Sequence, residues 1–404
     1  MNRWKKIKLD DVGEIVTGKT PETIDPTNYG SDYMFLGPTD LHKHFIISKS
    51  EKMISEKGLL SIKGSIIDGL SILVGCIGWD MGNVALVNVK CATNQQINSI
   101  TKIKDEYNPY YIYYWFKQKK QYLFQIASVT RTPMLKKSFF SSIELNIPDK
   151  SQQDKVVSIL VALDSKIELN NRINAQLEAM AKTLYDYWFV QFDFPDANGK
   201  PYKSSGGAMV WNEELKREIP HKEGWKLVSL GEEVNIFDSK RIPLSSIERE
   251  KRRGKYPYYG ATCIMDYIDD YIFDGEYILL AEDGSVMDEW GNPIVQYIWG
   301  KTWVNNHAHI LQPKEQQNIQ YLFYLLKSIS VVQIMTGSIQ KKINQENLVN
   351  VKVVIPDNRT LEKFSKFASP IRKQMINIYE ENQKLSELRD WLLPMLMNGQ
   401  VKVK

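Results

Sequence analysis

The sequence has few cysteines, no long apolar run and little net charge. The three cysteines, Cys76, Cys91 and Cys263, lie far apart and outside CxxC spacing, so they predict no disulfide framework and favour a reducing cytoplasm. No segment approaches the roughly 18 apolar residues of a membrane span. The basic start at residues 1–8 is not followed by the apolar run of a signal peptide. We therefore expect a cytoplasmic protein without a membrane partner.

The loops that hold many cofactors are also missing. The 23 glycines never form Gly-x-Gly, so a dinucleotide site, a methyltransferase cofactor loop and a Walker A loop are all unsupported. The segment Asn108-Pro109-Tyr110-Tyr111 is similar to the Asn-Pro-Pro-Tyr motif with which amino-methyltransferases hold a flipped base, but the second proline is absent. A helix start with Asn as N-cap and Pro at the first helical position explains this segment better.

Two further patterns could carry chemistry. Asp196 followed by Glu214-Leu215-Lys216 formally matches a two-carboxylate nuclease pattern, but Asp196 lies among turn-forming residues, and we interpret the match as chance. His307-Ala308-His309 could place two imidazoles on one face of a strand, yet no cysteine or third histidine stands nearby, which favours a structural or base-contacting pair. We expect no catalytic residue, no metal and no cofactor in this chain.

What is present is an ordinary globular composition with local clusters of positive charge. The length of 404 residues predicts two to three domains. The 52 Lys and Arg residues against 48 Asp and Glu residues leave a net charge of only +4, so a surface that binds a polyanion must come from local clusters. The densest cluster runs from Lys240 to Lys255 and leads into Tyr256-Pro257-Tyr258-Tyr259-Gly260. Such residues suit contact with phosphate and base; the alternative is a solvated loop beside a buried tyrosine.

The sequence contains a long internal repeat. Trp4-Lys5-Lys6-Ile7-Lys8-Leu9 returns as Trp225-Lys226-Leu227-Val228-Ser229-Leu230, and Ile147-Pro148-Asp149 returns as Ile355-Pro356-Asp357. From the second match onward the offset stays at 208 residues. Because the matches keep one order along the chain, they indicate that a whole structural plan is duplicated.

Each copy begins with a globule and ends with a helix. Residues 1–149 and 223–357 hold short apolar runs, such as Ser71–Val74 and Tyr277–Ala281, between turn residues, which predicts mixed α/β globules. In two later segments the apolar residues recur every three or four positions, which predicts long amphipathic helices with a narrow, coiled-coil-like seam. The helical segments are residues 150–190 and 358–404. The turn-rich connector between the copies is residues 191–222.

The two helices are expected to bury their seams against each other, because neither has a second amphipathic partner in its own half. A pseudo-two-fold axis makes this pairing antiparallel and leaves one globule at each end. The predicted fold class is α+β, with two mixed α/β domains separated by two long antiparallel coiled-coil helices. Asn174 and Asn382 share one register position, where a buried Asn can fix register, but solvent exposure is an equal alternative. The residues expected to pair the helices are Ile167, Asn174, Leu177, Leu184, Met375, Asn382, Leu385 and Leu392.

In the order of its motifs, the chain resembles the specificity (S) subunits of type I restriction-modification systems along essentially its whole length. The motifs are Trp-Lys-x-x-x-Leu at the start of each half, Thr17-Gly18-Lys19-Thr20-Pro21, the segment from Tyr256 to Ala261, both Ile-Pro-Asp boundaries, and the connector from Phe194 to Trp211. Each motif is short, but their order, together with the two long helices, is specific to this family.

The resemblance implies that each globule is a target recognition domain, which reads one half of a bipartite target in double-stranded DNA, while the helices set the unread gap. It also implies a chain without catalysis of its own. Two methyltransferase subunits would dock on it and methylate adenine with S-adenosylmethionine, and restriction subunits that cleave DNA with ATP and magnesium can join them. Two other functions stay open, namely methyltransferase or nuclease activity of the chain itself and a helical scaffold without a role in DNA binding.

Carried over by position, the resemblance also implies which residues face DNA. Those in the first globule are Lys19, Thr20, Trp79, Asn83, Asn94, Gln95, Arg131 and Lys136. Those in the second are Lys240, Arg241, Arg252, Arg253, Lys255, Tyr256, Tyr258, Tyr259, Asn306 and His307. The loop at Gly78-Trp79 has no clear counterpart in the second copy.

Overall fold

The computed structural model describes residues 4–42, 45–129, 132–288, 290–337, 341–401 and 403. The chain divides into two compact units, and each unit combines one globule with parts of both long helices. The first unit contains Met1–Ile173 and Ile378–Lys404, and the second contains Asn174–Asn377. Each unit is therefore built from both halves of the sequence. The division into five consecutive segments stays a prediction.

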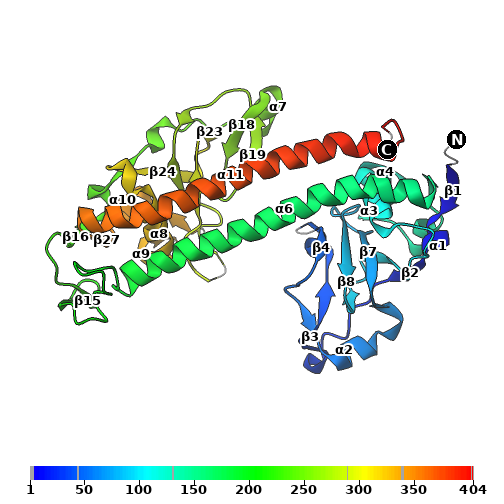
Figure 1. Cartoon of the computed structure of the whole chain (residues 1–404), viewed down its shortest axis with the longest axis horizontal. Coiled ribbons are helices and arrows are strands. Elements are labelled where there is room, and N and C mark those ends of the chain that lie inside the picture. Colours follow the sequence, from blue (N-terminus) through cyan, green and yellow to red (C-terminus); the bar gives the residue numbers. More distant parts are fainter. Residues whose placement is uncertain are drawn as a thin grey trace. The chain divides into compact units, whose positions relative to one another are not determined.

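The first unit packs two sheets and helix α3 around strand β7 (Figure 1). One sheet has the strand order β2-β10-β7-β8-β4 and the other β5-β3-β9-β6. Ile72 and Val74 of β7 share a core with α3, whereas Leu73 faces the second sheet, so the apolar run is buried on both faces. The elements of this globule are β1 (Lys5–Lys8), α1 (Leu9–Val12), β2 (Glu14–Thr17), β3 (Tyr29–Leu36), β4 (Ile46–Ile47), β5 (Met53–Ile54), α2 (Glu56–Ser61), β6 (Ile66–Ile67), β7 (Leu70–Gly75), β8 (Val84–Asn88), β9 (Cys91–Thr93), β10 (Ile97–Thr101), α3 (Pro109–Gln118), α4 (Lys120–Ile126), β11 (Ser128–Val129), β12 (Pro133–Met134), α5 (Lys137–Ser141) and β13 (Glu144–Ile147).

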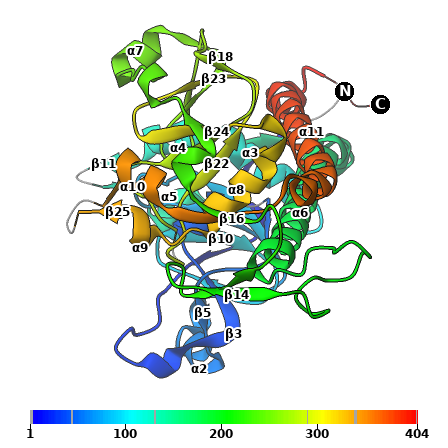
Figure 2. The same ribbon diagram turned by 90° about the vertical axis from the view of Figure 1, so that its left-hand side faces the viewer.

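The second unit repeats this plan with strand β21 at its centre. Its sheets have the orders β17-β24-β21-β22 and β19-β18-β23-β20, and α8 packs on the first of them (Figure 2). Ile278 and Leu280 of β21 share a core with α8, whereas Leu279 faces the second sheet. The elements are β14 (Met209–Asn212), β15 (Arg217–Pro220), β16 (Lys226–Ser229), β17 (Val234–Ile236), α7 (Ser246–Lys251), β18 (Arg253–Tyr259), β19 (Ile264–Ile268), β20 (Phe273–Asp274), β21 (Tyr277–Ala281), β22 (Val295–Ile298), β23 (Lys301–Val304), β24 (Ala308–Pro313), α8 (Ile319–Ser328), α9 (Val331–Ile334), β25 (Met335–Thr336), β26 (Lys342–Ile343), α10 (Gln345–Asn350) and β27 (Lys352–Ile355).

The repeated Trp-Lys-x-x-x-Leu motif closes each globule onto its long helix. β1 pairs antiparallel with β13, and β16 pairs in the same way with β27, so each globule starts and ends on one two-stranded ribbon. The final leucine of each motif, Leu9 or Leu230, is fully buried, and its backbone N–H donates to the carbonyl oxygen of the residue just before the last strand of the globule, Ile143 or Val351. The motif thus fixes where the chain leaves the globule and enters the helix.

The two long helices are α6 (Lys150–Tyr185), which continues into a π-helical turn at Asp186–Val190, and α11 (Asn358–Met397). At about 1.5 Å per residue, their 36 and 40 residues give lengths of roughly 54 and 60 Å. Within each unit the two helices run antiparallel. Residues of α6 with higher numbers contact residues of α11 with lower numbers. Among the described helices, none combines the length and apolar character needed to cross a membrane.

The seam between the helices is more polar than a coiled-coil pattern predicts. In the first unit, Asn170 donates to Glu381 and Asn382 over 2.7 and 2.8 Å. In the second, Asn174 donates to the carbonyl oxygen of Met375 over 3.3 Å. Asn174 and Asn382 therefore lie in the seam rather than in solvent. Of the expected pairing residues, Leu184 and Leu392 pack against the globule cores. The apolar members of the expected set are all half-buried: Ile167, Leu177, Leu184, Met375, Leu385 and Leu392.

Candidate nucleic-acid interface

Four loop segments of the first unit meet at one end of its central sheet. In the antiparallel ladder the end of β2 lies beside the start of β10, which lies beside the end of β7 and, next to it, the start of β8. Backbone hydrogen bonds tie the loops together: Gly18 N–H donates to Ile97, Cys76 N–H to Gln96, and Gly78 N–H to Pro133. We call residues 18–20, 76–83, 94–96 and 132–136 the first-unit edge.

The second unit has an equivalent edge, which sequence comparison alone did not align. The ends of β17 and β21 and the starts of β24 and β22 meet in the same ladder arrangement. Glu282 N–H donates to His307, and Ile343 N–H donates to Glu282, so a hairpin again closes against the central loop. We call residues 238–241, 282–288, 290–294, 305–307 and 341–343 the second-unit edge. The loop at Gly78-Trp79, which has no clear counterpart in the repeated sequence, thus corresponds in the sheet order to the longer loop between β21 and β22.

Most of the expected first-globule residues gather at the first-unit edge. Lys19, Gln95 and Lys136 are exposed, and the Thr20 hydroxyl donates to Gln95 over 2.7 Å. Trp79 is 78% exposed and stacks on Phe124, with ring centroids 5.9 Å apart. Asn83 and Asn94 lie half-buried in the same loops. Arg131 lies outside the described residues.

The second-globule residues separate into two groups. Lys240, Arg241, Asn306 and His307 lie on the second-unit edge, whereas the residues from Arg252 to Tyr259 lie at the start of or within β18, in the other sheet. The basic run from Lys240 to Lys255 contains helix α7 and the start of this strand. Arg252 is half-buried, pairs with Asp269 over 2.9 Å and lies over the Trp303 ring, while Arg253 and Lys255 are exposed and Tyr256 is half-buried against Tyr271.

Two of the expected DNA contacts are core residues, and a third, Arg241, is bound within the protein. Tyr258 is 1% exposed and its hydroxyl accepts from the backbone N–H of Leu244, and Tyr259 is 8% exposed in the core beside β21. The bulky rings at these positions fill the space between strands. The expectation that Tyr258 and Tyr259 face DNA is therefore wrong. Arg241 is held by Glu282 at 2.5 Å and by the carbonyl oxygen of Ala308 at 2.8 Å, beneath the exposed loop residues.

The two histidines of His307-Ala308-His309 have different surroundings. His307 is exposed, and its Nδ1 lies 2.7 Å from Asp283. His309 is buried, with Nδ1 2.5 Å from Asp238 and Nε2 2.8 Å from the carbonyl oxygen of Ile343. Burial disfavours its charged form, but these hydrogen bonds and the nearby carboxylates outweigh burial and raise its pKa. Asp238, Glu282 and His309 could together hold a metal, but the Arg241 guanidinium already supplies the positive charge between the two carboxylates.

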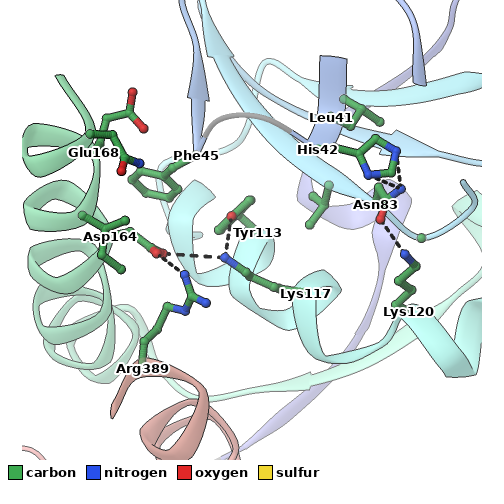
Figure 3. Close-up of a pocket in the computed structure, with 14 residues that line it drawn as sticks. Leu41, His42, Phe45, Asn83, Tyr113, Lys117, Lys120, Asp164, Glu168 and Arg389 are labelled. Carbon is green, nitrogen blue, oxygen red and sulfur yellow. Dashed lines mark hydrogen bonds and ion pairs between the residues drawn. The ribbon is translucent and has the colours of Figure 1, made fainter. Parts of the chain in front are cut away.

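A cavity of about 320 Å³ lies behind the loop between β7 and β8 (Figure 3). Lys120 of α4 donates to Asn83 over 2.7 Å and so supports the loop from the cavity side. At the other wall, buried Asp164 accepts from Arg389 over 2.7 Å and from the Tyr114 hydroxyl over 2.6 Å. Burial lowers the pKa of Lys117, whose ammonium lies 3.9 Å from Asp164. The cavity therefore links the exposed loop to the helix seam through charged groups that already have partners.

The two sequence patterns that are similar to catalytic motifs have structural explanations. The Asn108 side chain accepts from the backbone N–H groups of Tyr110 and Tyr111 at the start of α3, which confirms the helix-cap interpretation. Asp196 accepts from the N–H groups of Asn198 and Lys200 and so closes a turn.

Comparison with known proteins adds independent findings. The family model described as type I restriction modification DNA specificity domain matches residues 1–179 and 222–387. The MjaIX specificity subunit of Methanocaldococcus jannaschii is 28% identical over 423 residues, which cover 99% of this chain and 94% of that protein. The HindI specificity subunit of Haemophilus influenzae is 24% identical over 322 residues, which cover 65% of this chain and 70% of that protein. The crystal structure of an S subunit from M. genitalium aligns over 98% of this chain and 96% of its own, with a TM-score of 0.57 at 17% identity, and so shares the fold.

Proposed function

The chain belongs to the type I restriction-modification DNA specificity family, and on that premise we propose that it selects the DNA target for such a system, with each edge reading one half of a bipartite sequence. In this proposal the chain does no chemistry itself. Adenine methylation with S-adenosylmethionine takes place on two methyltransferase subunits, and cleavage with ATP and magnesium on restriction subunits.

The observation that carries the proposal is that the two edges share one backbone arrangement but carry different side chains. Four loop segments close on one another in the same way at both edges. Their residues differ: Asn94-Gln95-Gln96 at the first-unit edge stands where Asn305-Asn306-His307 stands at the second. Because base edges are read by the hydrogen-bonding groups of individual side chains, equivalent frames with different groups suit two different half-sites.

Within this proposal the exposed edge residues take two roles. Lysines contact phosphate and position the duplex, while amide, imidazole and aromatic groups face the bases. Arg252, Arg253, Lys255 and Tyr256 form a flanking group on the second sheet that suits backbone contact. The proposed edge contacts are Lys19, Thr20, Trp79, Asn83, Asn94, Gln95, Lys136, Lys240, Asn306 and His307.

The long helices suit the spacing and docking part of this function. Each unit holds parts of both α6 and α11, and in each unit polar contacts fix the antiparallel register of the helices. Within each unit, the ribbon of β1 with β13 or of β16 with β27 fixes where the globule joins its helix. We assign to these helices the setting of the unread gap and the docking of the methyltransferase subunits.

The experiment that tests the proposal uses the chain assembled with its methyltransferase partner. The complex is incubated with a randomised duplex library, and bound duplexes are sequenced after several rounds of selection. The expected result is a bipartite consensus with a constant gap. Binding without sequence preference contradicts the proposal, as does a single continuous consensus. Methylation or cleavage by the purified chain alone, lost in a Glu214→Ala variant, supports an enzyme instead.

A further inference from the structure

Trp79 and Trp290 occupy equivalent loops of the two units. Trp79 lies between β7 and β8, and Trp290 lies between β21 and β22, the corresponding pair of strands in the second unit. Both loops are closed by a hairpin, since Gly78 N–H donates to Pro133 and Ile343 N–H donates to Glu282.

Both indoles are 78% exposed. The two loops differ in length and sequence, and Trp79 follows Gly78 directly whereas Trp290 comes late in its loop, so no single repeated position accounts for both. Large aromatic side chains are stabilised by burial, and an aromatic ring left exposed at an interface is a typical anchor for a partner. Two such rings on equivalent edges indicate one kind of partner for both.

Each tryptophan has a support within its own unit. Trp79 stacks on Phe124 of α4 at an angle of 28° between the ring planes. At Trp290 the loop is fixed by Asp288, which accepts from the backbone N–H groups of Trp290 and Asn292 over 3.0 and 2.8 Å. Partial burial opposes ionisation, but these hydrogen bonds outweigh it and lower the pKa of Asp288. The Trp79 ring is therefore supported by stacking, and Trp290 is carried on a loop whose backbone is fixed by hydrogen bonds.

Cationic side chains contact, or belong to, the edge that carries each ring. Lys120 bonds to Asn83 within the first loop, and Lys136 is exposed one residue beyond Leu135, whose N–H donates to Cys76. At the second edge, Lys341 lies 3.9 Å from the Met287 sulfur, and Lys342 pairs with Asp283 in a backbone bridge. An exposed aromatic face on an edge that also carries cations fits a ligand that combines apolar planes with phosphate, which is a base step of duplex DNA.

We propose that Trp79 and Trp290 are the paired aromatic DNA contacts of this chain, and that each packs its indole against a base step in one half of the target. This inference rests on the proposed function and deepens it, because it assigns one ring to each half-site and adds Trp290, which no sequence motif singled out.

The test uses the complex with the methyltransferase partner and two probes, a duplex selected from the randomised library and an unselected duplex of equal length. Trp79→Ala and Trp290→Ala are each expected to lower affinity for the selected duplex roughly tenfold, without changing the salt slope, because no phosphate contact is lost. Trp79→Phe keeps an aromatic face and is expected to retain most of the affinity. Trp211→Ala is the matched control, since Trp211 is 54% exposed in β14, outside both edges.

The outcomes separate the inference from the proposed function. Scrambling one half of the selected duplex is expected to abolish the effect of one tryptophan variant and leave the effect of the other. If the unmodified complex prefers the selected duplex but both alanine variants bind within twofold of it, the inference is wrong while the proposed function stands. If the alanine variants lose the methyltransferase partner instead, the rings contact protein and the inference is again wrong. If the unmodified complex shows no preference, both fail.

Discussion

At the residue scale, His309 lies behind the second-unit edge with both ring nitrogens hydrogen-bonded. An imidazole that donates from Nδ1 to Asp238 and from Nε2 to the Ile343 carbonyl oxygen must carry both protons. Arg241 and Glu282 complete the cluster beneath the exposed loop. The cluster ties the end of β17, the β21 loop and the hairpin to β24, so the positions of the exposed groups depend on a buried charge.

The raised pKa of His309 predicts a pH-dependent stability. Its folded pKa lies above the unfolded value of about 6.5, so the stabilisation is fully present below pH of about 6.5 and is lost as pH rises through the folded pKa. His309→Gln removes the titration and is expected to cost about 1.5–3 kcal/mol at low pH and less at high pH. Urea unfolding of both proteins at several pH values measures this, and a difference that does not change with pH contradicts the assignment.

The exposed lysines of the edges predict a change in the salt dependence of DNA binding. If Lys136 and Lys240 contact phosphate, each alanine variant lowers the slope of log affinity against log salt by about one. Lys373→Ala is the control, because Lys373 is exposed on α11, outside both edges. Fluorescence anisotropy of a labelled duplex across a salt series gives the slopes, and equal slopes for all three variants would place the lysines away from DNA.

Single residues mark where sequence reasoning succeeds and where it stops. The cap role of Asn108 was predictable because it depends only on local sequence. Trp290 was missed because its equivalence to Trp79 is topological and their loops share no register. Tyr258 was misplaced because a run of basic and aromatic residues cannot show which rings turn into the core between two strands.

At the element scale, the pairing of α6 with α11 contains two ion pairs of opposite sense, each with one buried and one half-buried partner. The offset of 208 residues places Asp164 and Arg372 at one register position. Asp164 pairs with Arg389 over 2.7 Å, and Arg372 pairs with Glu178 over 3.4 Å, so the charge at this position and the charge of its partner are both reversed between the units. The apolar period predicted the helices and their antiparallel pairing, but it could not predict these charges, because periodicity does not distinguish a buried carboxylate from an exposed one.

The Asp164–Arg389 pair predicts a non-additive effect of mutation. Arg389→Met leaves a carboxylate with 4% side-chain exposure without its guanidinium partner, which is expected to cost about 3–5 kcal/mol. Adding Asp164→Asn removes the charge but keeps an acceptor for Tyr114, so the double variant is expected to be more stable than the single one. Thermal or urea unfolding of the single and double variants measures the coupling. A double variant no more stable than Arg389→Met would show that the pair contributes little to holding the helices together.

At the scale of the whole molecule, the small net charge of +4 agrees with the proposal that DNA contacts are limited to the two edges and the flanking group at β18. Most Lys and Arg residues are matched by acidic ones, including several within the edges, such as Asp283 beside His307. Under the proposed function, non-specific attraction to phosphate is then expected to be weak, and affinity is expected to depend on both half-sites being engaged at once. One chain that carries both edges makes the second contact intramolecular.

This dependence predicts how affinity varies with the gap between half-sites. If the helices hold the edges at a fixed separation, an insertion of about 5 bp turns one half-site to the far side of the duplex, because the helical repeat is about 10 bp. The complex is expected to bind such a duplex no better than one with a single half-site. An insertion of about 10 bp restores the facing but adds roughly 34 Å, so affinity is expected to stay low. Competition binding with a gap series measures this. Equal affinity across the series would mean that the edges act as independent readers on a flexible connection, whereas recovery only at 10 bp would mean that the chain fixes their rotation but not their distance.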